Sequence, residues 1–193
     1  MTDIPALAEG AADPASWGAS GVEVAPAPQW LTSEERATWV RLSAVLELLP
    51  AALDSQLRRD ADLTYFDYYL LAMLSETSER TLRMSALAHR TNATLPRLSH
   101  VVRRLEERGL VTRSQCLEDG RATNARLTDA GWEALVAAAP GHVTTVRHHV
   151  VDALTPGQLH TLGEIADQLL RRLDPQGRMT VPPDPAVAAA EAS

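Results

Sequence analysis

The stretch from Thr94 to Gly109, TLPRLSHVVRRLEERG, combines an apolar stripe with an arginine-rich polar side. Its apolar residues recur at intervals of three and four, which predicts one buried side of an α-helix. They are Leu98, Val101, Val102 and Leu105. Thr94 is a suitable N-cap, and Pro96 falls in the first turn, where a missing N–H costs nothing. The guanidinium, hydroxyl and imidazole groups on the other side fit phosphates and base edges, although such a side also occurs as a plain solvated surface.

The distribution of charge favours the nucleic-acid interpretation. The chain of 193 residues has a net charge of −7, and all 18 of its basic residues are arginine. Residues 78–127 nevertheless hold ten arginines against five acids, a balance of +5. A basic segment inside an acidic chain is typical of a protein that meets a polyanion.

The elements around this helix predict a helix-turn-helix with a wing. Ser85 is expected to cap a short helix over residues 86–90, and a tight turn at residues 91–93 leads into the arginine-rich helix. Two strand-like runs, 110–117 and 122–127, enclose an Asp-Gly pair, which is a strong hairpin signal. The hairpin carries basic side chains suited to a minor groove. The candidate DNA-binding residues are Thr94, Arg97, Ser99, His100, Arg103, Arg104, Arg113, Asp119 and Arg121.

Long apolar-striped helices are expected on both sides of this unit, one ending near Arg59 and two after Thr128. Capping boxes predict helix starts at Thr32 and at Thr155, and another predicts a helix from Thr64 to Ser75. The long helices carry more apolar surface than one small winged domain covers, so we expect a homodimer. The predicted fold is mainly α with a small β-hairpin (α+β), a winged helix-turn-helix with long N- and C-terminal dimerisation helices.

The predicted organisation is a single folded unit between two disordered ends. Residues 1–29 form an Ala/Pro/Gly-rich arm, and residues 174–193 a Pro/Ala-rich tail. Within residues 30–173, the dimerisation helices occupy 30–60 and 128–173, and the winged helix-turn-helix occupies 61–127. The N-terminus lacks the features of a secretory signal and no apolar stretch is long enough to span a membrane, so a cytoplasmic location is expected.

From about residue 30 to 173 the sequence resembles the MarR family of dimeric winged-helix transcriptional regulators. The resemblance rests on residues 82–88, 97–100, 104–111, 113, 119–121 and 127–131. It implies recognition helices in successive major grooves of a pseudo-palindromic operator in double-stranded DNA. It also implies that Asp119 orients an arginine and that Arg121 enters the minor groove. Leu95 and Pro96 replace the small polar residues usual in the family, which puts base contacts from these two positions in doubt.

The same resemblance suggests a small-molecule effector site between the dimerisation helices and the DNA-binding part. The candidate effector-binding residues are Trp39, Tyr65, Tyr68, Tyr69 and Met73. The alternative for each of them is a place in the core between these parts. Effector binding changes DNA affinity only if the effector prefers a dimer geometry that fits the grooves poorly.

Other reactive residues give weaker signals. Cys116, the single cysteine, lies in a wing strand near arginines and offers a redox-responsive alternative, but an unreactive small side chain is the preferred interpretation. His142, His148 and His149 are expected at the surface or in a dimer interface rather than around a metal. No nucleophile, phosphate-binding loop or carboxylate pair predicts an enzyme, and no cofactor is expected.

The sequence therefore predicts a sequence-specific DNA-binding transcriptional regulator, a dimeric repressor released by a small-molecule effector. A winged-helix protein-interaction module without sequence-specific DNA binding remains the alternative.

Overall fold

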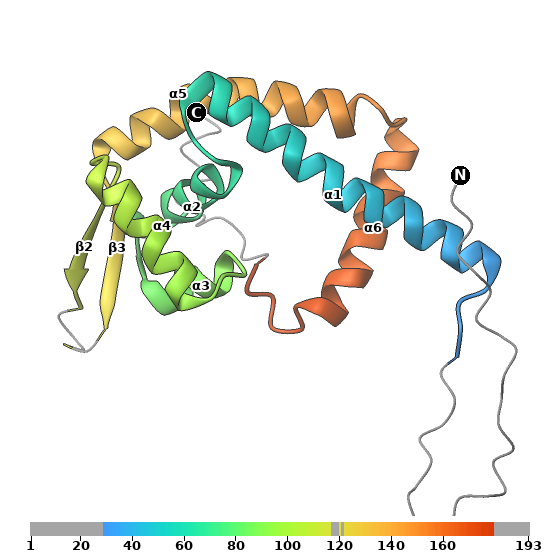
Figure 1. Cartoon of the computed structure of the whole chain (residues 1–193), viewed down its shortest axis with the longest axis horizontal. Coiled ribbons are helices and arrows are strands. Elements are labelled where there is room, and N and C mark those ends of the chain that lie inside the picture. Colours follow the sequence, from blue (N-terminus) through green and yellow to red (C-terminus); the bar gives the residue numbers. More distant parts are fainter. Residues whose placement is uncertain (1–28, 117–119, 121, 180–193) are drawn as a thin grey trace, which may run out of the picture. The chain divides into compact units, whose positions relative to one another are not determined.

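The computed structural model describes residues 29–116, 120 and 122–179 (Figure 1). The chain divides into two compact units, residues 1–39 and 40–193. The described residues are mostly helical and contain a three-stranded antiparallel sheet, as the sequence predicts for the fold class. The elements are α1 (Ser33–Ala61), α2 (Tyr65–Ser75), the 3-10 turn η2 (Ser78–Arg80), β1 (Thr81–Arg83), α3 (Met84–Arg90), α4 (Leu95–Glu107), β2 (Val111–Gln115), β3 (Thr123–Leu127), α5 (Asp129–Val146), the π-helical turn η3 (Arg147–Val151) and α6 (Pro156–Leu173).

Reciprocal side-chain caps fix the starts of the helices, and the three expected capping boxes are confirmed. The Thr32 N–H donates to Glu35 at 2.7 Å at the start of α1, and the boxes of α2 and α6 are complete. These contacts satisfy N–H groups that a helix leaves unpaired in its first turn. The third helix differs from the prediction, because it starts at Met84, directly after β1, and Ser85 lies inside it.

The core of the second unit is made mainly of leucine and valine side chains from α2, α3, α4 and the sheet, with further side chains from α1 and α5. Leu70, Leu74, Leu87, Leu98 and Leu105 are completely buried. Their spacing within each helix turns one side of α2 and α4 inward, which leaves the opposite side of α4 at the surface. The residues that hold α4 in place are thus the apolar stripe expected from the sequence.

The sheet has the order β1-β3-β2, so the hairpin strands pair with each other and β1 adds to the outer edge of β3. Val111 lies opposite Leu127 at the buried base of the hairpin. Gly109, at φ +72°, ends α4 and lets the chain turn directly into β2. The wing is therefore fixed to the C-terminal end of α4.

The long helices α1, α5 and α6 leave many of their apolar side chains exposed. In α6 none of the residues is buried, and Leu162, Ile165 and Leu169 are between 42% and 49% exposed. Only the C-terminal half of α1 enters the core, through Leu53 and Leu57. No helix in the described ranges is both long and apolar enough to cross a membrane.

Candidate nucleic-acid interface

The outer side of α4 presents four polar residues to solvent. Arg97, Ser99, His100 and Arg103 are all exposed, and we call them the contact surface. The guanidinium of Arg97 lies 4.7 Å from the centre of the Phe66 ring, an attractive cation–π arrangement that orients it. Arg103 and Nδ1 of His100 are 3.1 Å apart. The sequence thus brings together a compact set of groups that can bond phosphates and base edges.

Thr94 has a structural role in this interface. Its hydroxyl accepts the backbone N–H of Arg97 at 3.5 Å and so caps α4. Leu95, in the next position, is 50% exposed. The start of the helix is therefore polar in its cap and apolar in its first residue.

Two of the expected contact residues are bound to carboxylates of the protein. Arg104 forms an ion pair with Asp67 of α2, whose side chain is only 2% exposed. Arg113 of β2 donates from Nε to Glu106 of α4 at 2.8 Å. Hydrogen bonds from Arg113 hold the pKa of Glu106 below its ordinary value. Both arginines thus stabilise the position of α4, a role that spacing alone did not reveal.

The wing lies beside the start of α4, and an open pocket with a volume of about 350 Å³ lies between them. Its lining consists of Arg83, Met84, Ser85, Leu95, Ser99, Arg113, Ala122 and Thr123. Asp119 and Arg121, the expected wing-tip residues, lie outside the described residues. The neighbouring strand β3 carries a further exposed arginine, Arg126, opposite Thr112 of β2.

The tyrosines expected at an effector site gather on one side of α2. Tyr65 and Tyr69 stack with ring centres 6.3 Å apart, and Tyr68 lies 4.4 Å from the ring of His142 in α5. The Tyr69 hydroxyl donates to the backbone oxygen of Arg90 at 3.2 Å. Met73 packs against the core, whereas Trp39 belongs to the first unit and is 55% exposed.

His142, which was expected at the surface or in a dimer interface, is partly buried and joins this aromatic cluster. Burial lowers its pKa, which favours the neutral imidazole. Its Nδ1 atom is buried without a hydrogen-bond partner, as is Oε1 of the buried Gln56 in α1. Because His142 and Tyr68 are 74 positions apart, no local pattern could have paired them.

Cys116 is 7% exposed, and its sulfur lies 3.5 Å from a guanidinium nitrogen of Arg83. An oxidant reaches a buried thiol poorly, which favours a packing role for this residue. Among the residues that the structure describes, no group of three or more His, Cys, Asp or Glu could hold a metal ion.

A short helix, a turn and an exposed basic helix, followed at once by a β-hairpin, define a winged helix-turn-helix protein. The MarR family model matches residues 63–123. The chain is similar to Sco3205, a MarR family transcriptional regulator from Streptomyces coelicolor in complex with DNA, with 45% identity and a TM-score of 0.75 over 79% of this chain and 95% of that one.

AbsC, a MarR family transcriptional regulator from Streptomyces coelicolor, is 37% identical, with a TM-score of 0.73 over 77% of this chain and all (100%) of that one. The chain belongs to the MarR family of transcriptional regulators. CouR from Rhodococcus jostii RHA1, bound to p-coumaroyl-CoA, is 21% identical with a TM-score of 0.62 over 72% of this chain and 93% of that one, and this likeness concerns the fold alone.

Proposed function

We propose that the protein binds a pseudo-palindromic operator in double-stranded DNA as a homodimer and represses transcription. The observation that carries the proposal is the contact surface, a set of exposed Arg, Ser and His side chains on a helix whose opposite side is buried. The solved complex of Sco3205 with DNA supports this use of the fold.

The dimer is inferred from the apolar faces of the terminal helices. A groove of about 410 Å³ lies between α1 and η3, lined by Val45, Leu48, Leu49, Ala52, His149 and Val150. Together with the exposed leucines and isoleucine of α6, this surface suits a second copy of the chain, because large exposed apolar patches mark association sites. A two-fold dimer presents two contact surfaces to two half-sites.

A titration of DNA binding against salt tests the proposal. The DNA upstream of the protein's own gene is compared with random duplex of equal length. We expect tighter binding to the upstream DNA and a binding constant that falls steeply with salt, since each neutralised phosphate contributes about −0.9 to the logarithmic slope. Equal, salt-independent binding to both would instead favour the protein-interaction module. A reporter gene behind the same DNA gives the sign of regulation, and higher expression with the protein present would overturn repression.

Single substitutions distinguish side chains that contact base edges from side chains that contact the DNA backbone or the minor groove. We expect His100→Ala and Arg103→Ala to change the preferred sequence, because side chains in the major groove distinguish base pairs. Arg121→Ala, which changes a residue expected at the wing tip, should weaken binding to all DNA, because contacts to phosphates and the minor groove carry little sequence information. Equal losses on operator and random DNA for all three variants would contradict this division.

We also propose that a small aromatic effector binds beside Tyr65, Tyr68 and His142 and releases the DNA. Aromatic rings favour stacking partners, and the unpartnered atoms of His142 and Gln56 offer polar contacts nearby. Thermal shift measurements with simple phenols and benzoates test this. A stabilising compound that also weakens operator binding supports it, whereas binding unaffected by His142→Phe and Tyr68→Ala would place the effector elsewhere.

A further inference from the structure

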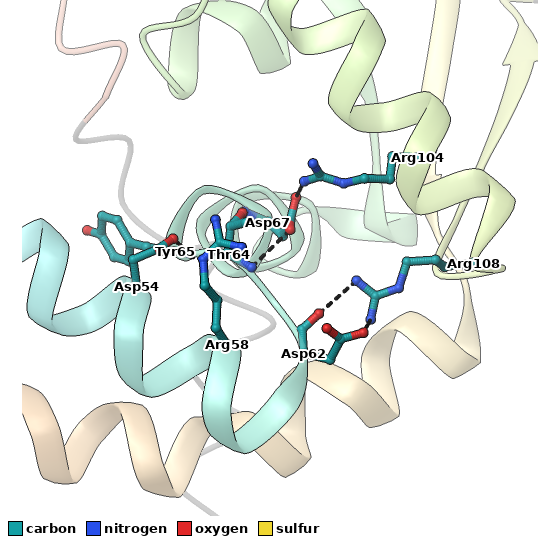
Figure 2. A network of polar contacts seen from close by, with 8 residues as sticks. All are labelled: Asp54, Arg58, Asp62, Thr64, Tyr65, Asp67, Arg104 and Arg108. Carbon is teal, nitrogen blue, oxygen red and sulfur yellow. Dashed lines mark hydrogen bonds and ion pairs between the residues drawn. The ribbon is translucent and has the colours of Figure 1, made fainter.

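Arg104 of α4 and Arg108, the C-cap of the same helix, extend away from the contact surface to the connection between α1 and α2. Arg104 pairs with Asp67, and Arg108 donates from Nη1 to the backbone oxygen of Asp62 at 2.9 Å (Figure 2). A second nitrogen of Arg108 lies 3.4 Å from the Asp62 carboxylate. The two arginines are four residues apart and so lie on the same side of the helix. We call residues 62–67, which both arginines contact, the elbow.

Asp67 has both carboxylate oxygens engaged. Oδ2 accepts the backbone N–H of Thr64 at 3.0 Å, which completes the cap of α2, and Oδ1 accepts from Arg104. The side chain of Asp67 is 2% exposed, and that of Arg104 is 42% exposed. A buried carboxylate is costly unless a positive charge and hydrogen bonds compensate it. The orientation of Arg104 is therefore tied to a rigid helix start.

The elbow is itself attached to α1. The backbone N–H of Tyr65 donates to Oδ1 of Asp54 at 2.9 Å, while Arg58 donates to Oδ2 of the same carboxylate at 2.5 Å (Figure 2). Leu63 of the elbow is 1% exposed and belongs to the hydrophobic core. A continuous set of polar contacts thus runs from α1 through the elbow to α4.

We propose that Asp67 is a positioning residue for DNA recognition, which holds Arg104 and thereby fixes the rotation of α4 about its own axis. Apolar packing of Leu98, Val102 and Leu105 attracts α4 to the core but has little directional preference. Charge-assisted hydrogen bonds have a definite direction and length. Hydrogen bonds to base edges depend on the angle of the helix, so losing the pair weakens specific binding. The proposal rests on the proposed binding of DNA by α4.

The competing role for Arg104 is a direct contact with a DNA phosphate. The two roles differ in how Arg104→Gln behaves when Asp67 is changed as well. If Arg104 acts through Asp67, Arg104→Gln has little effect on DNA affinity once the carboxylate is removed. If Arg104 contacts a phosphate, the substitution weakens binding equally with and without that carboxylate. Double-mutant cycles measure this difference, and contacting residues show couplings of about 0.5–3 kcal/mol, which correspond to roughly 2- to 150-fold in affinity.

The experiment compares wild type, R104Q, D67N and D67N/R104Q on operator and on random DNA at several salt concentrations. We expect R104Q to weaken operator binding roughly tenfold in the wild-type background and less than about twofold in the D67N background. Random DNA should be bound within about twofold of wild type, with an unchanged salt slope. Equal losses in both backgrounds and on both DNAs, with the slope reduced by about 1, would overturn the proposal.

Arg59→Gln is the matched control, since it removes one exposed arginine near the end of α1 that belongs neither to the contact surface, nor to the elbow, nor to the apolar faces proposed for the dimer, and it should leave operator binding unchanged. Circular dichroism and thermal melting establish that each variant is folded. R104Q leaves a buried carboxylate without its cation, so if it fails to fold, D67N/R104Q is compared with D67N alone. Weaker binding of the double variant to random DNA, with a reduced salt slope, overturns the positioning role. Wild type that shows no preference for operator defeats the proposed function and this proposal with it, whereas additive losses defeat only the proposal.

Discussion

The winged helix-turn-helix and the terminal helices use similar apolar residues in opposite ways. Leu105 of α4 is completely buried within the single chain, whereas Leu162 of α6 is 43% exposed. α1 combines both situations, with Leu57 in the core and Leu46 58% exposed. The first region buries most of its apolar side chains within the chain, and the second leaves many of them exposed.

This difference separates two sources of stability. Burial in the core stabilises each protomer regardless of concentration. Apolar surface on α6 contributes only when another surface covers it, so its contribution depends on protein concentration. In the proposed dimer, DNA recognition would need both, because the core holds α4 and the terminal helices would set the distance between two copies of it.

The largest effect is expected when a leucine is replaced by alanine both in the winged helix-turn-helix and in a terminal helix. Leu105→Ala should lower the free energy of unfolding by about 2–5 kcal/mol at any concentration, because it leaves a cavity in a fully buried site. Leu162→Ala should cost much less in dilute protein and more in concentrated protein. Urea unfolding at two concentrations measures both. Equal, concentration-independent losses would show that α6 is not an association surface.

A charge on α6 should separate association from folding. Ile165→Asp places a carboxylate in the exposed apolar face and should weaken the dimer by about 2 kcal/mol or more, the range of residues central to an interface. Asp167→Asn is the control on the same helix. Sedimentation gives the dissociation constant, and circular dichroism should show unchanged helix content. A dimer as tight as wild type would place the interface elsewhere.

The aromatic cluster between α2 and α5 gives a smaller, pH-dependent effect. Burial lowers the pKa of His142 below its ordinary value of 6.5, so the unfolded chain binds this proton more readily. Stability should therefore be highest above about pH 6.5 and fall as the pH decreases below it. His142→Phe should remove this part of the decrease, as measured by thermal melting between pH 5 and pH 8, a range of roughly three units around the histidine pKa. If the variant lost as much stability at low pH as the wild type, His142 would not be the cause of the decrease.

The smallest effect is expected at the contact between the wing and α4. Glu106→Gln should cost about 0.5 kcal/mol at neutral pH, since its ion pair with Arg113 is partly exposed. Arg113 lowers the pKa of Glu106 from its ordinary 4.5, so this stabilisation is present above that pH and is lost as the pH falls further. Urea unfolding at pH 7 and pH 3 (roughly above and below the carboxylate titration) should show a difference from wild type only at the higher pH.

Local patterns were sufficient to predict the elements of the fold. Capping residues such as Thr32 and Thr155 and the intervals between apolar residues are short-range signals, and they placed most helices within a few residues. The start of the third helix was missed because Ser85 is a common cap type, while the structure starts that helix at Met84. The preference of Ser85 for a cap position was outweighed by the pairing of β1 with β3, which fixes the chain up to Arg83, so that the helix starts at the next residue.

The helix of the predicted site forms where the sequence places it, but the partners of its side chains were not predicted. Arg97, Ser99, His100 and Arg103 are exposed as the helical periodicity requires. The carboxylate of Asp67, 37 positions before Arg104, was visible in the sequence only as a cap of α2. Pairings over such distances depend on how α2 and α4 pack, and a single sequence contains no direct signal for that.

The division of α4 into two sides has a consequence for how regulators of this kind diversify. Its fixed side holds the apolar stripe with Arg104 and Arg108, and its free side holds the four residues of the contact surface. Exchanging residues on the free side leaves the buried core and the elbow intact, so under the proposed binding of DNA, mutation can sample new operators without first damaging the fold. On the same proposal, these four positions are a natural library for engineering DNA specificity.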